Sequence, residues 1–121
     1  MRAVAVKRAQ RLRTDADFQR VRAARQSWAH PLLVLYAAPN GLGLSRLGIS
    51  VGKRVARQAV VRNRVRRRVR EAVRLRYGRL APGYDLLFIA RAPAAEASWA
   101  ELSEVVEQLA RRARLLRDGA E

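Results

Sequence analysis

The chain has 121 residues and carries 26 Lys and Arg against 10 Asp and Glu, a formal net charge of +16. This length supports one domain, and a composition that is 50% hydrophobic allows a packed core and argues against general disorder. The absence of cysteine excludes disulfides, thiolate metal sites and cysteine nucleophiles. No apolar run reaches the roughly 18 residues that span a bilayer, and residues 1–6 are too short for a secretory signal. Because so large a charge repels itself, we expect a soluble, cytoplasmic domain that binds a polyanion.

The positive charge is concentrated in one part of the chain. Residues 53–79 carry twelve basic residues and one acidic residue, a net +11, whereas residues 1–52 carry +7 and residues 80–121 carry −2. Arginine accounts for 24 of the 26 basic residues. Guanidinium groups match phosphate oxygens well, although a GC-rich genome would also favour arginine over lysine. Such a bias does not explain the clustering, which predicts a localised binding surface on a nearly neutral support.

The N-terminal half predicts an arm, a short helix and two strands. Residues 1–13 are basic and lack acids, which predicts a flexible arm, although an arginine-rich targeting peptide has a similar composition. A helix is predicted from Thr14 to Arg25, because Thr14 is a good N-cap and carboxylates follow it in the first turn. Apolar residues predict strands over 32–36 and 47–51, separated by turn residues, with an extra short strand near 26–29.

The C-terminal half predicts a basic helix, a strand and a last helix. Valines four residues apart, from Val61 to Val73, predict that one stripe of a helix over 58–76 is buried. A continuous apolar run predicts a strand over 86–89, and Ser98 to Glu101 has the pattern of a capping box, opening a helix whose apolar face extends to Leu116. The order α-β-β-α-β-α predicts a single small α+β domain over 14–117, with a tail over 118–121.

Arginines cover the face of the central helix opposite the valines. Seven of them lie between positions 62 and 74, and like charges four residues apart destabilise a helix, so solvation alone does not explain the pattern. A basic ribosomal or chaperone-like RNA binder would fit this composition. A DNA-binding helix is disfavoured because no helix-turn-helix spacing is present, and a membrane-surface helix because its apolar face lacks bulky anchors.

The basic helix also carries a family resemblance. Lys53-Arg54-Val55, followed by the stretch 59–70, resembles the signature of the bacterial ribonuclease P protein subunit, whose core is Arg-Asn-Arg, an apolar residue, two bases and a further base three residues on. The resemblance continues in the expected order over about residues 11–116. It implies one α/β domain with a small sheet and a left-handed β-α-β crossover, a fold also found in a ribosomal protein domain. Pattern alone would favour a right-handed connection.

The resemblance implies that the chain is a subunit of ribonuclease P. Such a protein binds the catalytic RNA and the 5′ leader of precursor tRNA, and the RNA removes the leader by Mg²⁺-dependent endonucleolytic hydrolysis. We therefore expect no catalytic residue, metal ligand or cofactor on the protein itself, and no DNA or membrane partner. Carried over by position, the residues that face the catalytic RNA are Lys53, Arg54, Arg62, Asn63, Arg64, Arg66, Arg67 and Arg70.

The leader-binding residues implied by the resemblance are Phe18, Arg22 and Tyr36. Aromatic side chains stack on unpaired bases, and Arg22 stands where some members of the family have a second aromatic. Phe18 and Tyr36 could equally be core residues, because their elements must bury one face, and Asn63 could simply hydrogen-bond to a neighbouring loop. Trp28 and Trp99 are assigned to packing, and His30 to a turn. A structural RNA-binding protein with no role in cleavage is the alternative function.

Overall fold

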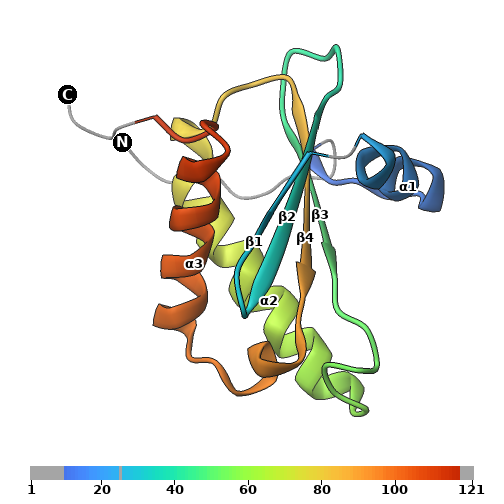
Figure 1. The fold of residues 1–121 in the computed structure, drawn as a ribbon, viewed down its shortest axis with the longest axis vertical. Helices are drawn as coiled ribbons and strands as arrows, with labels where there is room; N and C mark the ends of the chain where they lie inside the picture. Colours follow the sequence, from blue (N-terminus) through green and yellow to red (C-terminus); the bar gives the residue numbers. More distant parts are fainter. Residues whose placement is uncertain (1–9, 25, 118–121) are drawn as a thin grey trace.

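The computed structural model describes residues 10–24 and 26–117. Three helices and four strands form the fold, in the predicted order and with the extra short strand present (Figure 1). The helices are α1 (Asp15–Ala23), α2 (Ala59–Arg76) and α3 (Trp99–Arg112). The strands are β1 (Ser27–Ala29), β2 (Leu33–Pro39), β3 (Arg46–Ser50) and β4 (Tyr84–Ala90). Within the described part of the chain, no helix is long and apolar enough to cross a membrane.

The four strands form one mixed sheet in the order β1-β2-β4-β3. β2 pairs antiparallel with both β1 and β4, whereas β3 pairs parallel with β4. A parallel pair of neighbouring strands needs a crossover connection, and α2 supplies it between β3 and β4. The small α+β domain with a β-α-β unit is therefore confirmed.

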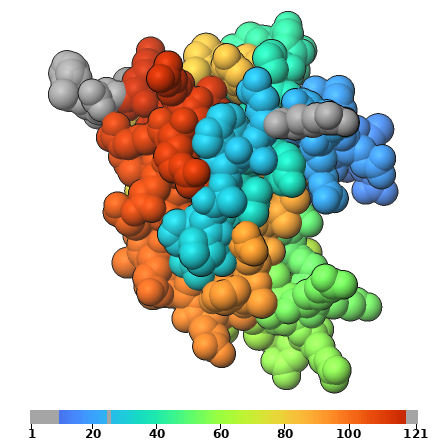
Figure 2. Space-filling view, viewed as in Figure 1, coloured from blue at the N-terminus to red at the C-terminus, as the bar shows by residue number. Residues whose placement is uncertain are grey.

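α2 and α3 cover one face of the sheet and form the main core with it (Figure 1). Val65, Val69 and Val73 are buried, as the valine stripe predicts, and pack with Phe88 of β4. Seen from the same side in Figure 2, α3 lies directly against the β1–β2 hairpin. An arginine contact closes this edge, since Arg112 donates to the backbone carbonyl of Ala29 at 2.7 Å.

The opposite face of the sheet is covered only in part, by α1 and the segment before it (Figure 1). Thr14 caps α1 as predicted, with its hydroxyl oxygen accepting from the Asp17 amide at 3.0 Å. Leu12 is buried, and its amide donates to the carbonyl of Leu47 at 2.8 Å. The packed domain therefore begins before Thr14, inside the segment 1–13 predicted as an arm. Residues 1–9 of that arm, Arg25 and the predicted tail 118–121 lie outside the described residues.

The last helix is shorter than its hydrophobic pattern predicts. α3 ends at Arg112, because Arg114 adopts a left-handed backbone conformation with φ of 61°. The amides of Arg114 and Leu115 donate to the carbonyls of Arg111 and Ala110, which is the hydrogen-bond pattern of a Schellman motif. Leu116 is buried beyond the helix, where it bridges to the chain near Leu80, so its placement on the helix face was wrong.

The two tryptophans differ in burial. Trp28 is half-buried and packs against the main core, as expected. The packing assignment is wrong for Trp99, whose surface is 38% exposed. Trp99 is the first residue of α3. His30 takes the predicted turn role, with its Nδ1 accepting from the Leu32 amide at 3.0 Å.

Candidate nucleic-acid interface

The arginine face of α2 follows from the burial of the opposite side. Because the valine side is packed, Asn63 and Arg67 are left exposed and Arg66 and Arg70 half-exposed on the outer side. Glu71 is the only acidic residue of the helix, and it pairs with Arg74, whose hydrogen bond lowers the pKa of the Glu71 carboxyl. The rest of this outer face is positively charged, as the sequence predicts.

Several arginines of the motif also bind the protein itself. Arg62 donates to the carbonyls of Ala56 and Arg57 at 3.0 and 2.6 Å, holding the loop that enters α2. Arg64 lies on another side of the helix and donates to the carbonyl of Ala95 at 3.2 Å. Arg68, which was not a predicted site residue, makes the same kind of bond to Ala97 at 2.7 Å. Arg62 and Arg64 therefore have a structural role besides any contact with RNA.

The loop between β3 and α2 lies against the start of the arginine face. Arg66 donates to Asn63 Oδ1 at 2.7 Å and to the Val51 carbonyl at 3.3 Å, so it joins the helix to the end of β3. Asn63 thus bonds within its own helix and not to a neighbouring loop. Lys53 and Arg54 follow Val51 and are exposed. This loop extends the positive surface of α2.

A groove runs between α1 and the open face of the sheet. Phe18, Arg22 and Ile89 are among the residues that line a hollow of about 200 Å³ there. Tyr36 lies in the same apolar cluster as Phe18 and Ile89, and the guanidinium carbon of Arg22 is 6.0 Å from the centre of its ring. That distance is within the range of a cation–π contact. Phe18 and Tyr36 are both partly buried, so each packs with the protein while keeping part of its ring accessible.

A second hollow, of about 100 Å³, connects this groove to the arginine helix. Phe18 and Arg70 both line it, together with Arg11 and Gly48. A Cβ added at Gly48 would lie 2.9 Å from Leu12 Cδ1 and 3.1 Å from Phe18 Cζ, so these side chains would have to shift. Burial, followed by the charges of Arg11 and Arg66, lowers the pKa of Arg70. Positive charge is therefore crowded at the junction of the two surfaces.

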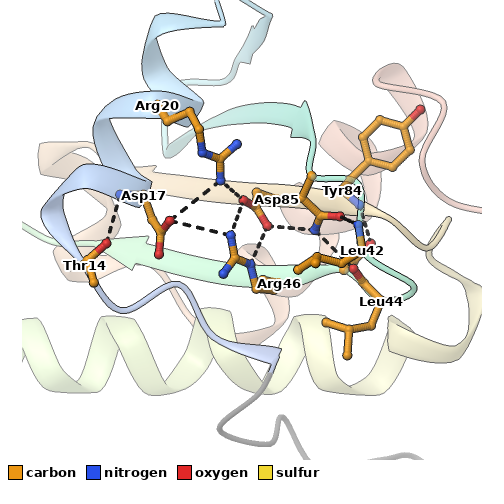
Figure 3. Close-up of polar contacts among 10 residues, drawn as sticks. Thr14, Asp17, Arg20, Leu42, Leu44, Arg46, Tyr84 and Asp85 are labelled. Carbon is orange, nitrogen blue, oxygen red and sulfur yellow. Dashed lines mark hydrogen bonds and ion pairs between the residues drawn. The ribbon is translucent and has the colours of Figure 1, made fainter.

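An ion cluster centred on Asp85, at the start of β4, was not predicted from the sequence (Figure 3). Asp85 is completely buried. Its carboxylate accepts from Arg46 at 2.9 and 2.8 Å, from Asn40 Nδ2 at 2.9 Å, and from Arg20. Burial alone would raise the pKa of Asp85, but these hydrogen bonds outweigh it and lower the pKa. An acid at the beginning of an otherwise apolar strand was the signal available in the sequence.

A basic helix beside a groove with accessible aromatic rings, on a small mixed sheet, defines an RNA-binding α+β protein. Residues 6–114 match the family model described as Ribonuclease P. The chain therefore belongs to the bacterial ribonuclease P protein component family, which acts in the maturation of tRNA 5′ ends, and its RNA partner is the ribonuclease P RNA.

Relatives in sequence and in structure agree with this family. The ribonuclease P protein component of Roseiflexus castenholzii is 53% identical over 109 residues, covering 89% of this chain and 88% of the relative. That of Clostridioides difficile is 40% identical over 102 residues, covering 84% and 89%. The structure of the Staphylococcus aureus RNase P protein has a TM-score of 0.83 at 31% identity, covering 91% of this chain and all of that one. The RNase P protein from Thermotoga maritima has a TM-score of 0.76 at 31% identity, covering 84% and 98%.

Proposed function

We propose that the chain assembles with ribonuclease P RNA in the cytoplasm and holds the 5′ leader of precursor tRNA in the groove beside α1. The proposal rests on two adjoining surfaces of this chain. One is a helix face of arginines, suited to a folded RNA. The other is a groove lined by Phe18 and Arg22, with the Tyr36 ring beside it, 6.0 Å from the Arg22 guanidinium carbon. Phosphate contacts supply affinity for a folded RNA, whereas stacking platforms suit a single strand.

In this proposal the RNA carries out the hydrolysis, with Mg²⁺ as its metal. Among residues 10–24 and 26–117, no three His, Cys, Asp or Glu side chains come together as metal ligands. No step of the proposal uses a metal held by this chain. Its own residues bind and orient: Arg67 and its neighbours hold the catalytic RNA, and Phe18 and Tyr36 stack on leader bases. Phe18 and Arg70 line the same hollow, so the surface proposed for the catalytic RNA lies next to the groove proposed for the leader.

Reconstitution tests this function. The protein is added to a bacterial ribonuclease P RNA at low Mg²⁺, and 5′ cleavage of a precursor tRNA is measured. We expect strong stimulation, because the protein replaces part of the charge neutralisation that Mg²⁺ supplies. An RNA that binds the protein but is cleaved no faster would support the alternative, a structural RNA-binding protein with no role in cleavage.

A further inference from the structure

α1 carries two of the proposed leader residues, but its own packing holds it weakly. It has nine residues, a length at which an isolated helix is marginal in water. Of these nine residues, all described by the structure, Val21 alone is fully buried. Val21 and the partly buried Phe18 pack in one apolar cluster, so apolar contacts hold the helix along a single narrow stripe. The orientation of Phe18 and Arg22 toward the groove needs a further contact.

The Asp85 cluster supplies that contact from the other flank of the helix (Figure 3). Successive helix residues are about 100° apart, so Phe18 and Arg22 lie on one flank of Val21. Asp17 and Arg20 lie on the opposite flank. Arg20 bonds Asp85 Oδ2 and lies 3.9 Å from Asp17, so it joins α1 to β4.

The partners of Arg20 are themselves held in place. Arg46 of β3 donates two hydrogen bonds to Asp85 and also lies 3.6 Å from Asp17 Oδ1. Asn40 donates to Asp85 Oδ1 at 2.9 Å and to the Leu44 carbonyl at 3.1 Å. The carboxylate that receives Arg20 is therefore fixed by two other segments of the chain. A bond to so rigid a partner can define the roll of a short helix.

We infer that Asp85, acting through Arg20, is a positioning residue for the leader groove. The inference rests on the proposed function, since it names what holds the leader residues in place. Arg20 is 44% exposed in its side chain, and on charge alone it would be counted among the phosphate-binding arginines. The structure assigns its charge to Asp85 instead. Arg20 then contributes to leader binding without touching RNA.

The primary test is Arg20→Ala, which removes the direct bond from α1 to Asp85, while Asp85 keeps Arg46 and Asn40 as partners and only the longer Asp17–Arg46 contact of 3.6 Å still joins α1 to the cluster. Amide hydrogen exchange of the protein alone should become faster in residues 15–23 and stay unchanged in α2. Unchanged exchange in α1 overturns the inference without reference to any RNA. Arg20→Lys, which keeps the charge, should restore part of the protection.

The functional arm uses the reconstituted holoenzyme and two substrates, a precursor tRNA with a leader of about ten nucleotides and the same tRNA without a leader. The ratio of their affinities should fall about tenfold in Arg20→Ala, comparable to the loss of one stacked base. Affinity for the catalytic RNA should stay the same. The slope of log affinity against log salt should also be unchanged, whereas loss of a phosphate contact would lower it by about 1.

Asp85→Asn and the double variant separate positioning from direct contact. If Arg20 acts through Asp85, the double variant loses no more leader affinity than either single variant. Glu107→Gln is the matched control, because Glu107 binds Arg76, Arg79 and Arg111 in a similar cluster that does not touch α1. Three results would each overturn the inference. They are losses of leader affinity that add in the double variant, a lower salt slope in Arg20→Ala, and a loss of leader affinity in Glu107→Gln as large as that in Arg20→Ala. A wild-type holoenzyme indifferent to the leader overturns the proposed function, and the inference with it.

Discussion

Phe18 of α1 and Arg70 of α2 line the same hollow beside β3, although 52 positions separate them in the chain. Leu12 and Gly48 lie between them, and the missing side chain of Gly48 leaves the space that Leu12 and Phe18 occupy. The surface proposed for the catalytic RNA and the groove proposed for the leader are therefore neighbours.

Arg67→Ala should weaken binding of ribonuclease P RNA without destabilising the protein. Arg67 is exposed, unlike Arg62 and Arg64, which hold backbone carbonyls of the fold. We expect the slope of log affinity against log salt to fall by about 1, the value for one phosphate contact. Filter binding over a series of salt concentrations measures it. Arg114→Ala, which removes the same charge from an exposed position just after α3, should leave the slope unchanged; equal effects would contradict the assignment.

Phe18→Ala should affect precursors with long leaders most. Stacking of one base on an aromatic ring contributes about 1–3 kcal/mol, so affinity for a precursor with a leader should fall by about tenfold or more. Affinity for tRNA without a leader should change little. Tyr77→Ala is the control, since Tyr77 is a partly buried aromatic packed on the helix-covered side of the sheet. A loss that does not depend on leader length would show that Phe18 is only a core residue.

Stability should fall in acid through Asp85 and Glu107. Hydrogen bonds from arginine lower the pKa of both carboxyls in the folded state, against the opposing effect of burial. Their stabilisation is therefore present above the unfolded pKa, near 4, and is lost as the pH falls through the lower folded pKa. Thermal melts between pH 6 and 2, followed by circular dichroism, should show this loss. Asp85→Asn should be less stable at neutral pH and less sensitive to acid; an unaltered acid profile would contradict an ionised Asp85.

Arg114→Gly should stabilise the protein. Arg114 has φ of 61° at the end of α3, a conformation that costs a residue with a Cβ about 1 kcal/mol relative to glycine. We expect a gain of up to ~1 kcal/mol and a melting temperature higher by about 4 °C. Arg112→Gly, at the last residue of α3, should instead lower the stability, because it places glycine where the backbone is helical and removes the bond to the Ala29 carbonyl. If Arg114→Gly is instead less stable than the wild type, the Arg114 side chain stabilises the fold by more than its backbone conformation costs.

The sequence predicted the elements where periodicity and capping chemistry act locally. The valine stripe from Val61 to Val73 gave the packed side of α2, and Thr14 and Ser98 marked the starts of α1 and α3. Both parts of the Ser98 capping box are present, with bonds of 2.8 and 3.1 Å. The end of α3 was missed because a left-handed arginine has no signature in composition, and the apolar residues continue past it.

The sequence alone determined that one helix buries a stripe of valines and presents arginines on its opposite face, because both the charge pattern and the spacing of the valines are local features. Only the tertiary structure decided which of those arginines face outward and which hold carbonyls of distant loops, as Arg64 does at Ala95. It also decided that Arg20 and Asp85, 65 positions apart, form an ion pair. Such pairings depend on how the strands are ordered in the sheet, and a hydrogen bond across that distance leaves no periodic trace in the sequence.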